Sequence, residues 1–176
     1  MRDGEYGKAE PLLRELVAAL PDVPLLRTDL AEALYKQGRL DQADAAFQQV
    51  IAMAPDDYRA RKAYGNFLVF GVQRCDEAVE QFTVALKQVP DDVYSLHDAA
   101  VALTVLGRFG EAEGHLQRAL QIEPRTPRLW QAMGVLRVKQ TRLGEAVRYF
   151  RRTLELDPEC REAQAALQWL RRHTRP

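Results

Sequence analysis

Histidine and cysteine side chains are the first candidates for chemistry in this chain, because they bind metals and act as bases or nucleophiles. The three histidines, His97, His115 and His173, are scattered, and no HExxH motif occurs. Cys75 and Cys160 lie 85 residues apart and form no CxxC pair. Because metal sites and disulfide frameworks need closer or more regular spacing, we expect no metal, no disulfide and a reducing compartment.

A phosphate-binding loop is the second candidate, since glycines let a backbone approach a phosphate closely. Gly107, Gly110 and Gly114 lie near one another, but no strand precedes them and their spacing does not match a dinucleotide-binding loop. We therefore expect no cofactor and no catalytic residue, and we predict that the chain is not an enzyme.

The overall composition is that of a folded domain. Of the 176 residues, 47% are apolar and 28% are charged, which excludes the disordered and membrane classes. No apolar run approaches the roughly 20 residues of a spanning helix, and the N-terminus lacks the apolar stretch of a signal peptide. We expect a cytoplasmic protein with no membrane insertion, or a periplasmic one if a longer precursor carries the address.

Charge is distributed unevenly, although lysine plus arginine and aspartate plus glutamate both number 25. Residues 125–176 contain 12 basic and 5 acidic side chains, and residues 1–124 contain 13 and 20. Arg148, Arg151 and Arg152 would suit phosphates, but aromatic platforms for bases are sparse, so we expect no nucleic acid. Attraction between the basic end of one molecule and the acidic part of another would give a homo-oligomer.

A period of about 34 residues runs through the whole chain. Prolines recur at intervals of 34, 35, 34 and 34 residues, at Pro21, Pro55, Pro90, Pro124 and Pro158. An alanine stands twelve residues before each proline, at Ala9, Ala43, Ala78, Ala112 and Ala146. A large apolar residue follows each alanine by four positions, at Leu13, Phe47, Phe82, Leu116 and Phe150. Several markers that share one period indicate an internal repeat.

Each marker has a physical role in a helical hairpin. An alanine and a large residue four positions later lie on one helix face, where the small side chain admits a neighbouring helix. Proline ends a helix because it has no backbone N–H to donate. The polar residues that follow can cap the next helix. The expected caps are the pairs Asp56-Asp57 and Asp91-Asp92, then Asp41 and Asp76 and, before Pro127, Thr126.

The pattern predicts an all-α chain. The first helix of each pair is expected at residues 24–37, 58–70, 93–106 and 127–140. The second helices are expected at residues 7–20, 41–53, 76–88, 110–122 and 144–156, and a last helix at 159–172. The 35-residue unit is expected to place its extra residue in the turn 71–75, where insertions are best tolerated.

These markers resemble the tetratricopeptide repeat, whose 34-residue signature reads W-x2-L-G-x2-Y, then A-x3-F, then P. The best-matching unit contains Trp130, Gly134, Ala146, Phe150 and Pro158, and Arg137 stands where the family prefers an aromatic residue. The chain is identified as a member of this family. Pentatricopeptide arrays, which repeat at 35 residues and bind RNA, do not show this schedule, and a non-repeat bundle is similarly disfavoured.

The resemblance implies a right-handed superhelical solenoid of antiparallel helix pairs, forming one domain over residues 1–176. The expected units are a half repeat at 1–23, full repeats at 24–57, 58–92, 93–126 and 127–160, and a capping helix at 161–176. In the half repeat, Leu12, Leu16 and Leu20 lack part of their usual cover. This favours either a fragment of a larger protein or an end that packs on a partner.

The repeat register also assigns the cysteines. Cys75 falls at a turn position that is apolar in the other units, so we expect it to fill the core. Its counterparts are Tyr6, Leu40, Phe109 and Leu143. Cys160 lies at a predicted helix start, where we expect an exposed thiol.

The resemblance implies a protein-interaction scaffold or adaptor that binds a peptide or protein segment in a concave groove lined by the first helices. It fits bacterial proteins of secretion, pilus or envelope assembly, and signalling. A regulatory segment of a larger glycosyltransferase or kinase, and a scaffold that self-assembles through the half repeat or the charged ends, remain alternatives. The groove-lining places are Asp29, Glu32, Tyr35, Lys36, Arg59, Lys62, Asn66, Val69, Tyr94, His97, Asp98, Val101, Arg128, Gln131, Val135 and Val138.

Some tetratricopeptide co-chaperones clamp a C-terminal carboxylate with lysine, asparagine and arginine from successive repeats. Lys62 and Asn66 match the first pair of that clamp, and Arg128 could replace a later lysine. Asp98 and Ala132 stand where the clamp needs asparagine and arginine. Because the Asp98 carboxylate would repel the ligand, the clamp is disfavoured.

Overall fold

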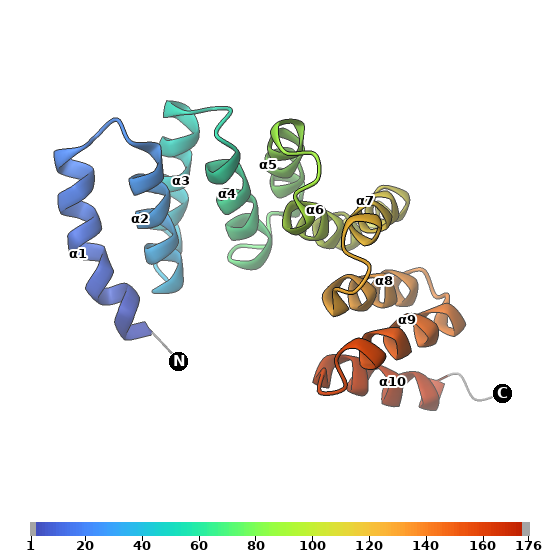
Figure 1. The fold of residues 1–176 in the computed structure, drawn as a ribbon. Coiled ribbons are helices and arrows are strands. Elements are labelled where there is room, and N and C mark those ends of the chain that lie inside the picture. Colours follow the sequence, from blue (N-terminus) through green and yellow to red (C-terminus); the bar gives the residue numbers. More distant parts are fainter. Residues whose placement is uncertain (1–2, 174–176) are drawn as a thin grey trace. The chain divides into compact units, whose positions relative to one another are not determined.

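The computed structural model describes the backbone of residues 3–173 and the side chains of residues 6–173. Over this range the regular secondary structure is entirely α-helical, in ten helices (Figure 1). They are α1 (Asp3–Ala19), α2 (Pro24–Lys36), α3 (Leu40–Met53), α4 (Tyr58–Phe70), α5 (Cys75–Gln88), α6 (Val93–Val105), α7 (Phe109–Ile122), α8 (Pro127–Lys139), α9 (Leu143–Leu156) and α10 (Arg161–His173). The predicted all-α repeat solenoid is confirmed. Residues 1–2 and 174–176, which belong to the first and last predicted units, lie outside the described residues.

The helices form two compact units, residues 1–90 and 91–176. In unit 1, α1 packs on α2, α2 on α3 and α4 on α5, and the first helices α2 and α4 also contact each other. Its core contains Phe47, Phe67 and Phe82, all fully buried. The rings of Phe47 and Tyr64 stack with their centroids 5.4 Å apart. Aromatic packing therefore holds the hairpins of unit 1 together.

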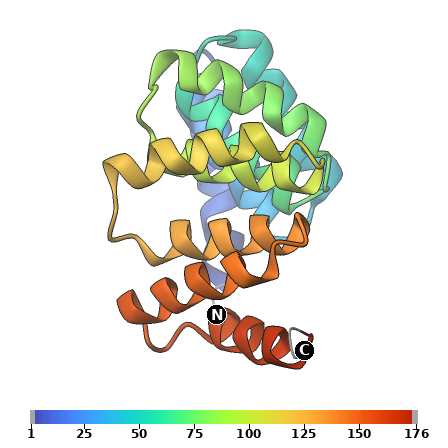
Figure 2. The ribbon, with the colours of Figure 1, turned by 90° about the vertical axis from the view of Figure 1, so that its right-hand side faces the viewer.

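Unit 2 repeats the same arrangement. Helix α6 packs on α7, α8 on α9, and α10 covers α9, while the first helices α6 and α8 contact each other. Figure 2 shows α8, α9 and α10 side by side. Leu103, Leu116 and Leu136 are fully buried between these helices. The predicted grouping of the chain into a single domain with the unit boundaries given above stays a prediction.

The alanine and large-residue markers form the core, as predicted. Ala43, Ala78, Ala112 and Ala146 each have 0% of their surface exposed, and the large residues that follow four positions later are between 0% and 2% exposed. In the leading half repeat, Ala9 and Leu13 are only partly buried. The difference follows from position, because no described helix precedes α1 to cover that face.

Helix starts agree in part with the expected caps. Asp57 accepts a hydrogen bond from the Ala60 N–H at 2.7 Å, and Asp92 accepts one from the Ser95 N–H at 2.8 Å. Both are N-caps, as predicted. Pro127 stands in the first turn of α8, but the Thr126 hydroxyl donates to Glu123 Oε2 at 2.7 Å instead of capping the helix. Thr126 therefore occupies the predicted N-cap position, but its side chain makes no capping hydrogen bond.

The caps predicted at Asp41 and Asp76 are wrong. Helices α3 and α5 begin one residue earlier than expected, at Leu40 and Cys75, and their N-cap positions are held by arginines. Asp41 and Asp76 therefore lie in the first helical turn. There a carboxylate stabilises the helix through its positive N-terminal dipole. Helix α1 likewise begins at Asp3, earlier than the expected residue 7.

The turn inside each hairpin requires a left-handed backbone. Gly38 and Gly107 have φ of 75°, and the corresponding positions in the other two hairpins are Gln73 at 57° and Thr141 at 59°. The extra residue of the 35-residue unit lies in this turn, as predicted, with Gly71 directly after α4. Because glycine adopts positive φ without steric cost, Gln73 and Thr141 are the strained versions of the same turn.

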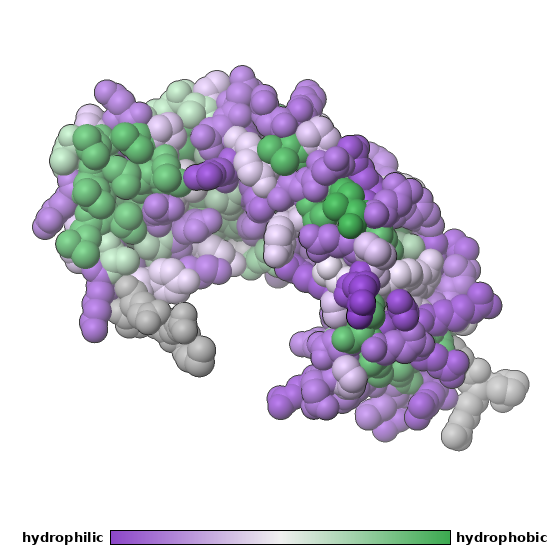
Figure 3. Space-filling view, viewed as in Figure 1, coloured by the Kyte–Doolittle hydropathy of each residue, from purple (hydrophilic) through white to green (hydrophobic). Residues whose placement is uncertain are grey.

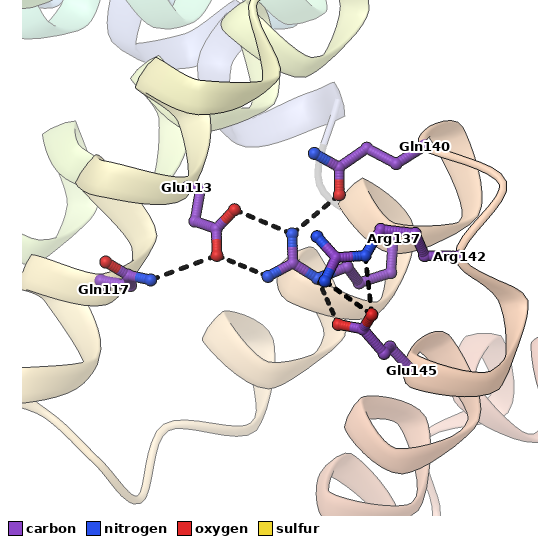
Figure 4. A network of polar contacts seen from close by, with 6 residues as sticks. All are labelled: Glu113, Gln117, Arg137, Gln140, Arg142 and Glu145. Carbon is purple, nitrogen blue, oxygen red and sulfur yellow. Dashed lines mark hydrogen bonds and ion pairs between the residues drawn. The ribbon is translucent and has the colours of Figure 1, made fainter.

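Arg137 stands where the repeat signature has an aromatic residue, and it forms a buried ion network there. Its side chain is 4% exposed, and its Nη1 donates to Glu113 Oε2 at 2.9 Å and to Gln140 Oε1 at 2.7 Å (Figure 4). Its Nε lies 3.2 Å from Glu145 Oε2. Figure 4 shows the guanidinium between Glu113 of α7 and Glu145 of α9. The arginine thus joins three helices at a place where the other described first helices carry a buried leucine.

The cysteine predictions have opposite outcomes. Cys75 is buried, and its burial raises the pKa of the thiol, as suits a core residue. Cys160 is also buried, with 9% of its surface exposed, so the expectation of an exposed thiol is wrong. It precedes α10 and packs in a cluster with Phe150, Ala163 and Leu170. The capping helix covers the thiol, a contact between distant segments that no local pattern specifies.

Helix α1 and the residue that follows it, Leu20, leave an apolar face uncovered. Leu12, Leu16 and Leu20 are 62%, 43% and 50% exposed. Figure 3 shows the resulting apolar patch over this helix, at the left of the view. The predicted lack of cover on these three leucines is confirmed.

Among the described residues, no helix combines the length and the apolar character needed to cross a bilayer. The same part of the chain contains no group of histidine, cysteine and carboxylate side chains arranged to hold a metal ion.

Candidate peptide-binding surface

A hollow of about 280 Å³ lies in unit 2 between the first helices α6 and α8. Its floor includes Leu116 of α7, which is 1% exposed. The other lining residues are His97, Ala100, Val101, Thr104 and Val105 of α6 and Arg128, Gln131, Ala132, Val135 and Lys139 of α8. The two helices place these side chains on one surface because the residues recur at helical spacing along each of them.

The middle of the hollow is apolar. Ala100 and Ala132 supply small side chains that leave space, and Val105 and Val135 stand at its edge with 65% and 42% of their surface exposed. The Thr104 hydroxyl donates to the Ala100 carbonyl at 2.7 Å, so its hydrogen-bonding capacity is used within α6. Covering exposed apolar surface of this kind with a partner lowers the free energy.

One end of the hollow carries a polar triad in which His97 and Asp98 are buried. His97 Nδ1 lies 2.6 Å from Asp98 Oδ1, and Arg128 Nη2 donates to the same oxygen at 3.0 Å. The Asp98 side chain is 6% exposed, whereas half of the Arg128 side chain faces solvent. The carboxylate therefore offsets the charge of the arginine from beneath. The charge of Arg128, which could replace a clamp lysine, is thus already paired with Asp98, and this also disfavours the carboxylate clamp.

The other end of the hollow carries Lys139, in the last turn of α8, where it is exposed. No ion pair joins it to a carboxylate of the described residues. The helix dipole also favours a cation at this position. Lys139 therefore provides an accessible positive charge at the edge of an apolar surface.

The corresponding surface of unit 1 is filled differently. Tyr35, at the position of Thr104 in the repeat register, packs its ring edge-on against Phe67 with centroids 5.4 Å apart. Lys62 Nζ lies 3.3 Å from the Tyr58 hydroxyl and 5.5 Å from the centre of that ring. Asn66 Oδ1 is buried and has no hydrogen-bond partner in the described residues. Unit 1 thus presents aromatic and polar groups where unit 2 presents aliphatic ones.

Asp29 and Glu32 are two carboxylates of the first helix α2. Partial desolvation raises the pKa of Asp29 and of Glu32, and the Asp29 carboxylate adds to the rise at Glu32. Lys36 lies 4.7 Å from the centre of the Tyr35 ring. The Arg59 guanidinium counteracts the rise at Asp29. Each of these side chains was predicted to line the groove, and that role stays a prediction.

The structure brings five of the predicted unit 2 residues together around the hollow: His97, Val101, Arg128, Gln131 and Val135. Tyr94 stays outside it and is 61% exposed, and Asp98 lies beneath Arg128. Val138 packs instead against the cluster around Phe150 and Cys160, and Val69 of unit 1 is buried at 6% exposed. Val101 and Val135 therefore line the hollow, and Val138 does not.

Sequence reasoning missed Val105 and Lys139. The signal was present, since both occupy the register position of Lys36, which was assigned to the groove in the first repeat. It also missed Ala100, Thr104 and Ala132. The two alanines leave space in the hollow, and the Thr104 hydroxyl already donates to the Ala100 carbonyl. Small side chains create space only once the neighbouring helix is in place.

Models of the tetratricopeptide repeat match residues 1–68, 70–127 and 129–162. The chain belongs to the tetratricopeptide repeat family. The family assignment made from the proline, alanine and phenylalanine spacing is thereby confirmed. Tetratricopeptide solenoids are in general protein-interaction scaffolds, and the present chain is of this general kind.

Two curated relatives are much longer than this chain. Protein FlbA of Caulobacter vibrioides is 27% identical over 159 residues, which cover 90% of this chain and 26% of FlbA. The Protein CTR9 homolog of Arabidopsis thaliana is 37% identical over 93 residues, covering 52% of this chain and 8% of that protein. The chain therefore spans about a quarter or less of the length of these relatives.

Solved tetratricopeptide structures share the fold. PilW, a widely conserved type IV pilus biogenesis factor, superimposes with a TM-score of 0.83 at 21% identity, over 96% of this chain and 84% of PilW. MamA from Desulfovibrio magneticus RS-1 gives a TM-score of 0.80 at 18% identity, over 90% of this chain and 89% of that one. These identities establish a common architecture.

Proposed function

We propose that this chain is an interaction scaffold that holds a peptide or protein segment on its first-helix surfaces, with the hollow of unit 2 as the anchor. The observation that carries the proposal is the exposure of Val105 and Val135 at the rim of an apolar hollow between α6 and α8. Covering such a surface is favourable, by about 25 cal/mol per Å² of apolar area. Catalysis is not part of the proposed role.

A substitution that blocks the hollow of unit 2 tests this proposal. Binders would be selected from a random displayed library of twelve-residue peptides against the full chain, and their affinity measured for the variant Val135→Glu. Val135 is exposed and glutamate is the better helix former, so the fold should survive while the apolar surface is interrupted. We expect at least a tenfold loss of affinity.

Ile122→Glu provides the matched control, because Ile122 is 41% exposed in the same unit and does not line the hollow. It should leave affinity unchanged. Ala132→Leu is a second blocking variant that fills the hollow without adding charge. Equal binding to all variants, with unchanged circular dichroism, would remove the hollow from the proposed function.

A role as the regulatory segment of a larger enzyme is the alternative that fits the length of the relatives. Since this chain spans 26% of FlbA and 8% of the CTR9 homolog, a parent chain with a further domain is a concrete expectation. The gene around this segment decides it: an adjoining glycosyltransferase or kinase domain supports the alternative. A parent with no catalytic domain rejects it.

Self-association through the leading half repeat is a further candidate, favoured by the exposed leucines of α1. It predicts that the molar mass in light scattering rises with protein concentration and changes with salt, since the charged ends would contribute. Replacing Leu12 and Leu16 by lysine should abolish the rise. A constant monomer mass at high concentration and low salt would reject this candidate.

The proposed compartment is the cytoplasm. Both cysteines are free and buried, which suits a reducing environment.

A further inference from the structure

We propose that the anchor of unit 2 binds an aliphatic side chain of an acidic partner segment, with a partner carboxylate at Lys139. This inference rests on the proposed function above and adds the chemistry of the partner. It is carried by the size of the hollow, by the charges around it and by the spacing of Val135 and Lys139 along α8.

The hollow is large enough to accept an aliphatic side chain. Its volume of about 280 Å³ lies just below the range of about 300–1,000 Å³ typical of small-molecule sites. Its lining of alanine, valine, leucine and the threonine methyl group offers dispersion contacts and few hydrogen bonds. A leucine, isoleucine or valine of the partner fits this surface. Among the described lining residues there is no phenylalanine, tyrosine or tryptophan, so a stacked nucleotide base is disfavoured.

The charges around the hollow are asymmetric. None of the described lining residues is acidic, and two of them, Arg128 and Lys139, are permanently basic. Arg128 is already paired with the buried Asp98 carboxylate at 3.0 Å, whereas Lys139 is exposed and has no such partner among the described residues. The favourable position for an added anion is therefore the Lys139 end. The Arg128 end offers its remaining N–H groups to neutral acceptors.

The spacing sets the sequence pattern of the partner. Val135 and Lys139 are four residues apart on one face of α8, about 6 Å along the helix axis. An extended segment advances about 3.3 Å per residue, so its aliphatic and acidic side chains should be two residues apart. A helical partner would place them three or four residues apart.

Selection from the displayed library tests the chemistry of the partner. The peptides that bind the full chain and lose affinity on Val135→Glu should share an aliphatic residue with aspartate or glutamate two residues away, or three to four away if helical. One such peptide and its variants would then be synthesised with blocked ends. Replacing its aliphatic residue by alanine should weaken binding about tenfold, and replacing its acidic residue by lysine about threefold or more.

Exchanging the charges of Lys139 and of the acidic peptide residue distinguishes this inference from nonspecific binding. Lys139→Glu should weaken the acidic peptide about threefold or more and strengthen the lysine-substituted peptide by a similar factor. Lys87→Glu is the matched control, because Lys87 is an exposed lysine in the last turn of α5 and belongs to unit 1. It should change neither affinity.

The outcomes distinguish the two proposals. If the peptides lose affinity on Val135→Glu but carry basic residues, or none charged, beside the anchor, the inference is overturned and the proposed function stands. If Lys139→Glu leaves the preference unchanged, the inference also fails. If no peptide depends on the hollow, both proposals fail together.

Discussion

A Cβ atom placed on Gly134 would lie 2.8 Å from Cε1 of the Phe150 ring. The same relationship recurs in unit 1, where a Cβ on Gly65 would lie 2.8 Å from the Phe82 ring. In both hairpins, the glycine of the first helix therefore receives the aromatic ring of the second helix. This contact is the physical reason for a small residue at this position of the repeat.

Gly134→Leu should lower the free energy of unfolding by about 1–3 kcal/mol, because the added side chain displaces the buried Phe150 ring. Gly114→Leu is the matched control. Gly114 lies within α7, is exposed, and has no atom within 4 Å of its Cβ position, so leucine should stabilise that helix by about 0.5–1 kcal/mol. Urea denaturation measures both changes. An unchanged midpoint for Gly134→Leu would contradict the register of the hairpin.

Thr141→Gly should stabilise the chain by about 1 kcal/mol. Thr141 has φ of 59°, a left-handed conformation that is unfavourable for a β-branched residue and natural for glycine. The opposite change, Gly107→Thr, should destabilise by about as much, since Gly107 holds the same turn at φ of 75°. Thermal unfolding of both variants tests the pair. Shifts of the same sign would rule out this account of the turn.

Glu113→Gln should destabilise the chain at neutral pH by about 1–2 kcal/mol, because it removes the charge that faces the buried Arg137. The hydrogen bonds from Arg137 hold the pKa of Glu113 below its ordinary value of 4.5. The stabilisation is therefore complete above pH 4.5 and is lost as the pH falls through the lowered value. The difference between the two proteins should shrink in acid.

Chemical denaturation at several pH values between 7 and 3 measures this difference. Glu155→Gln is a suitable control, because Glu155 forms an exposed pair with Arg152 at 2.7 Å. It should change stability little at any pH. A constant penalty for Glu113→Gln across the whole range would show that the charge of Glu113 is not what holds Arg137.

Changing Lys62 and Asn66 together to alanine should weaken partner binding without lowering the melting temperature. Asn66 Oδ1 has no hydrogen-bond partner among the described residues, and Lys62 contacts the Tyr58 ring at the surface, so the fold loses little. Titration calorimetry with a selected binder compares the double variant with Lys87→Ala. Equal affinity of the two would place the binding site away from the unit 1 surface.

The repeat is the part of this protein that sequence reasoning predicts best. Ala146 and Phe150 lie four residues apart on one helix face, and this spacing alone predicts that both are buried. Helix bounds agree within about one or two residues, apart from the start of α1, because prolines and turn residues act locally. The caps were less predictable, since Asp41 and Asp57 are alike in sequence but occupy different places relative to their helices.

The candidate site was predictable only in outline. The first-helix register located Val101 and Val135, but it also assigned Val138, which turns toward α9 and α10. The ion-pair partners of Arg137 could not be predicted from local sequence. Glu113 and Glu145 are 24 and 8 residues away and contact it only when three helices pack. The burial of Cys160 has the same origin.

The order of the residues along the chain by itself determined the helices, their pairing and the family, because these depend on periodic spacing and on interactions within a few turns. Tertiary structure alone decided which exposed side chains share a surface. The hollow has small alanines, Ala100 and Ala132, from both helices in its lining. Its charge is one-sided because Asp98 pairs with Arg128, whereas Lys139 is exposed and has no such partner among the described residues. Packing brings together side chains that are distant in the sequence, and local spacing does not specify these contacts.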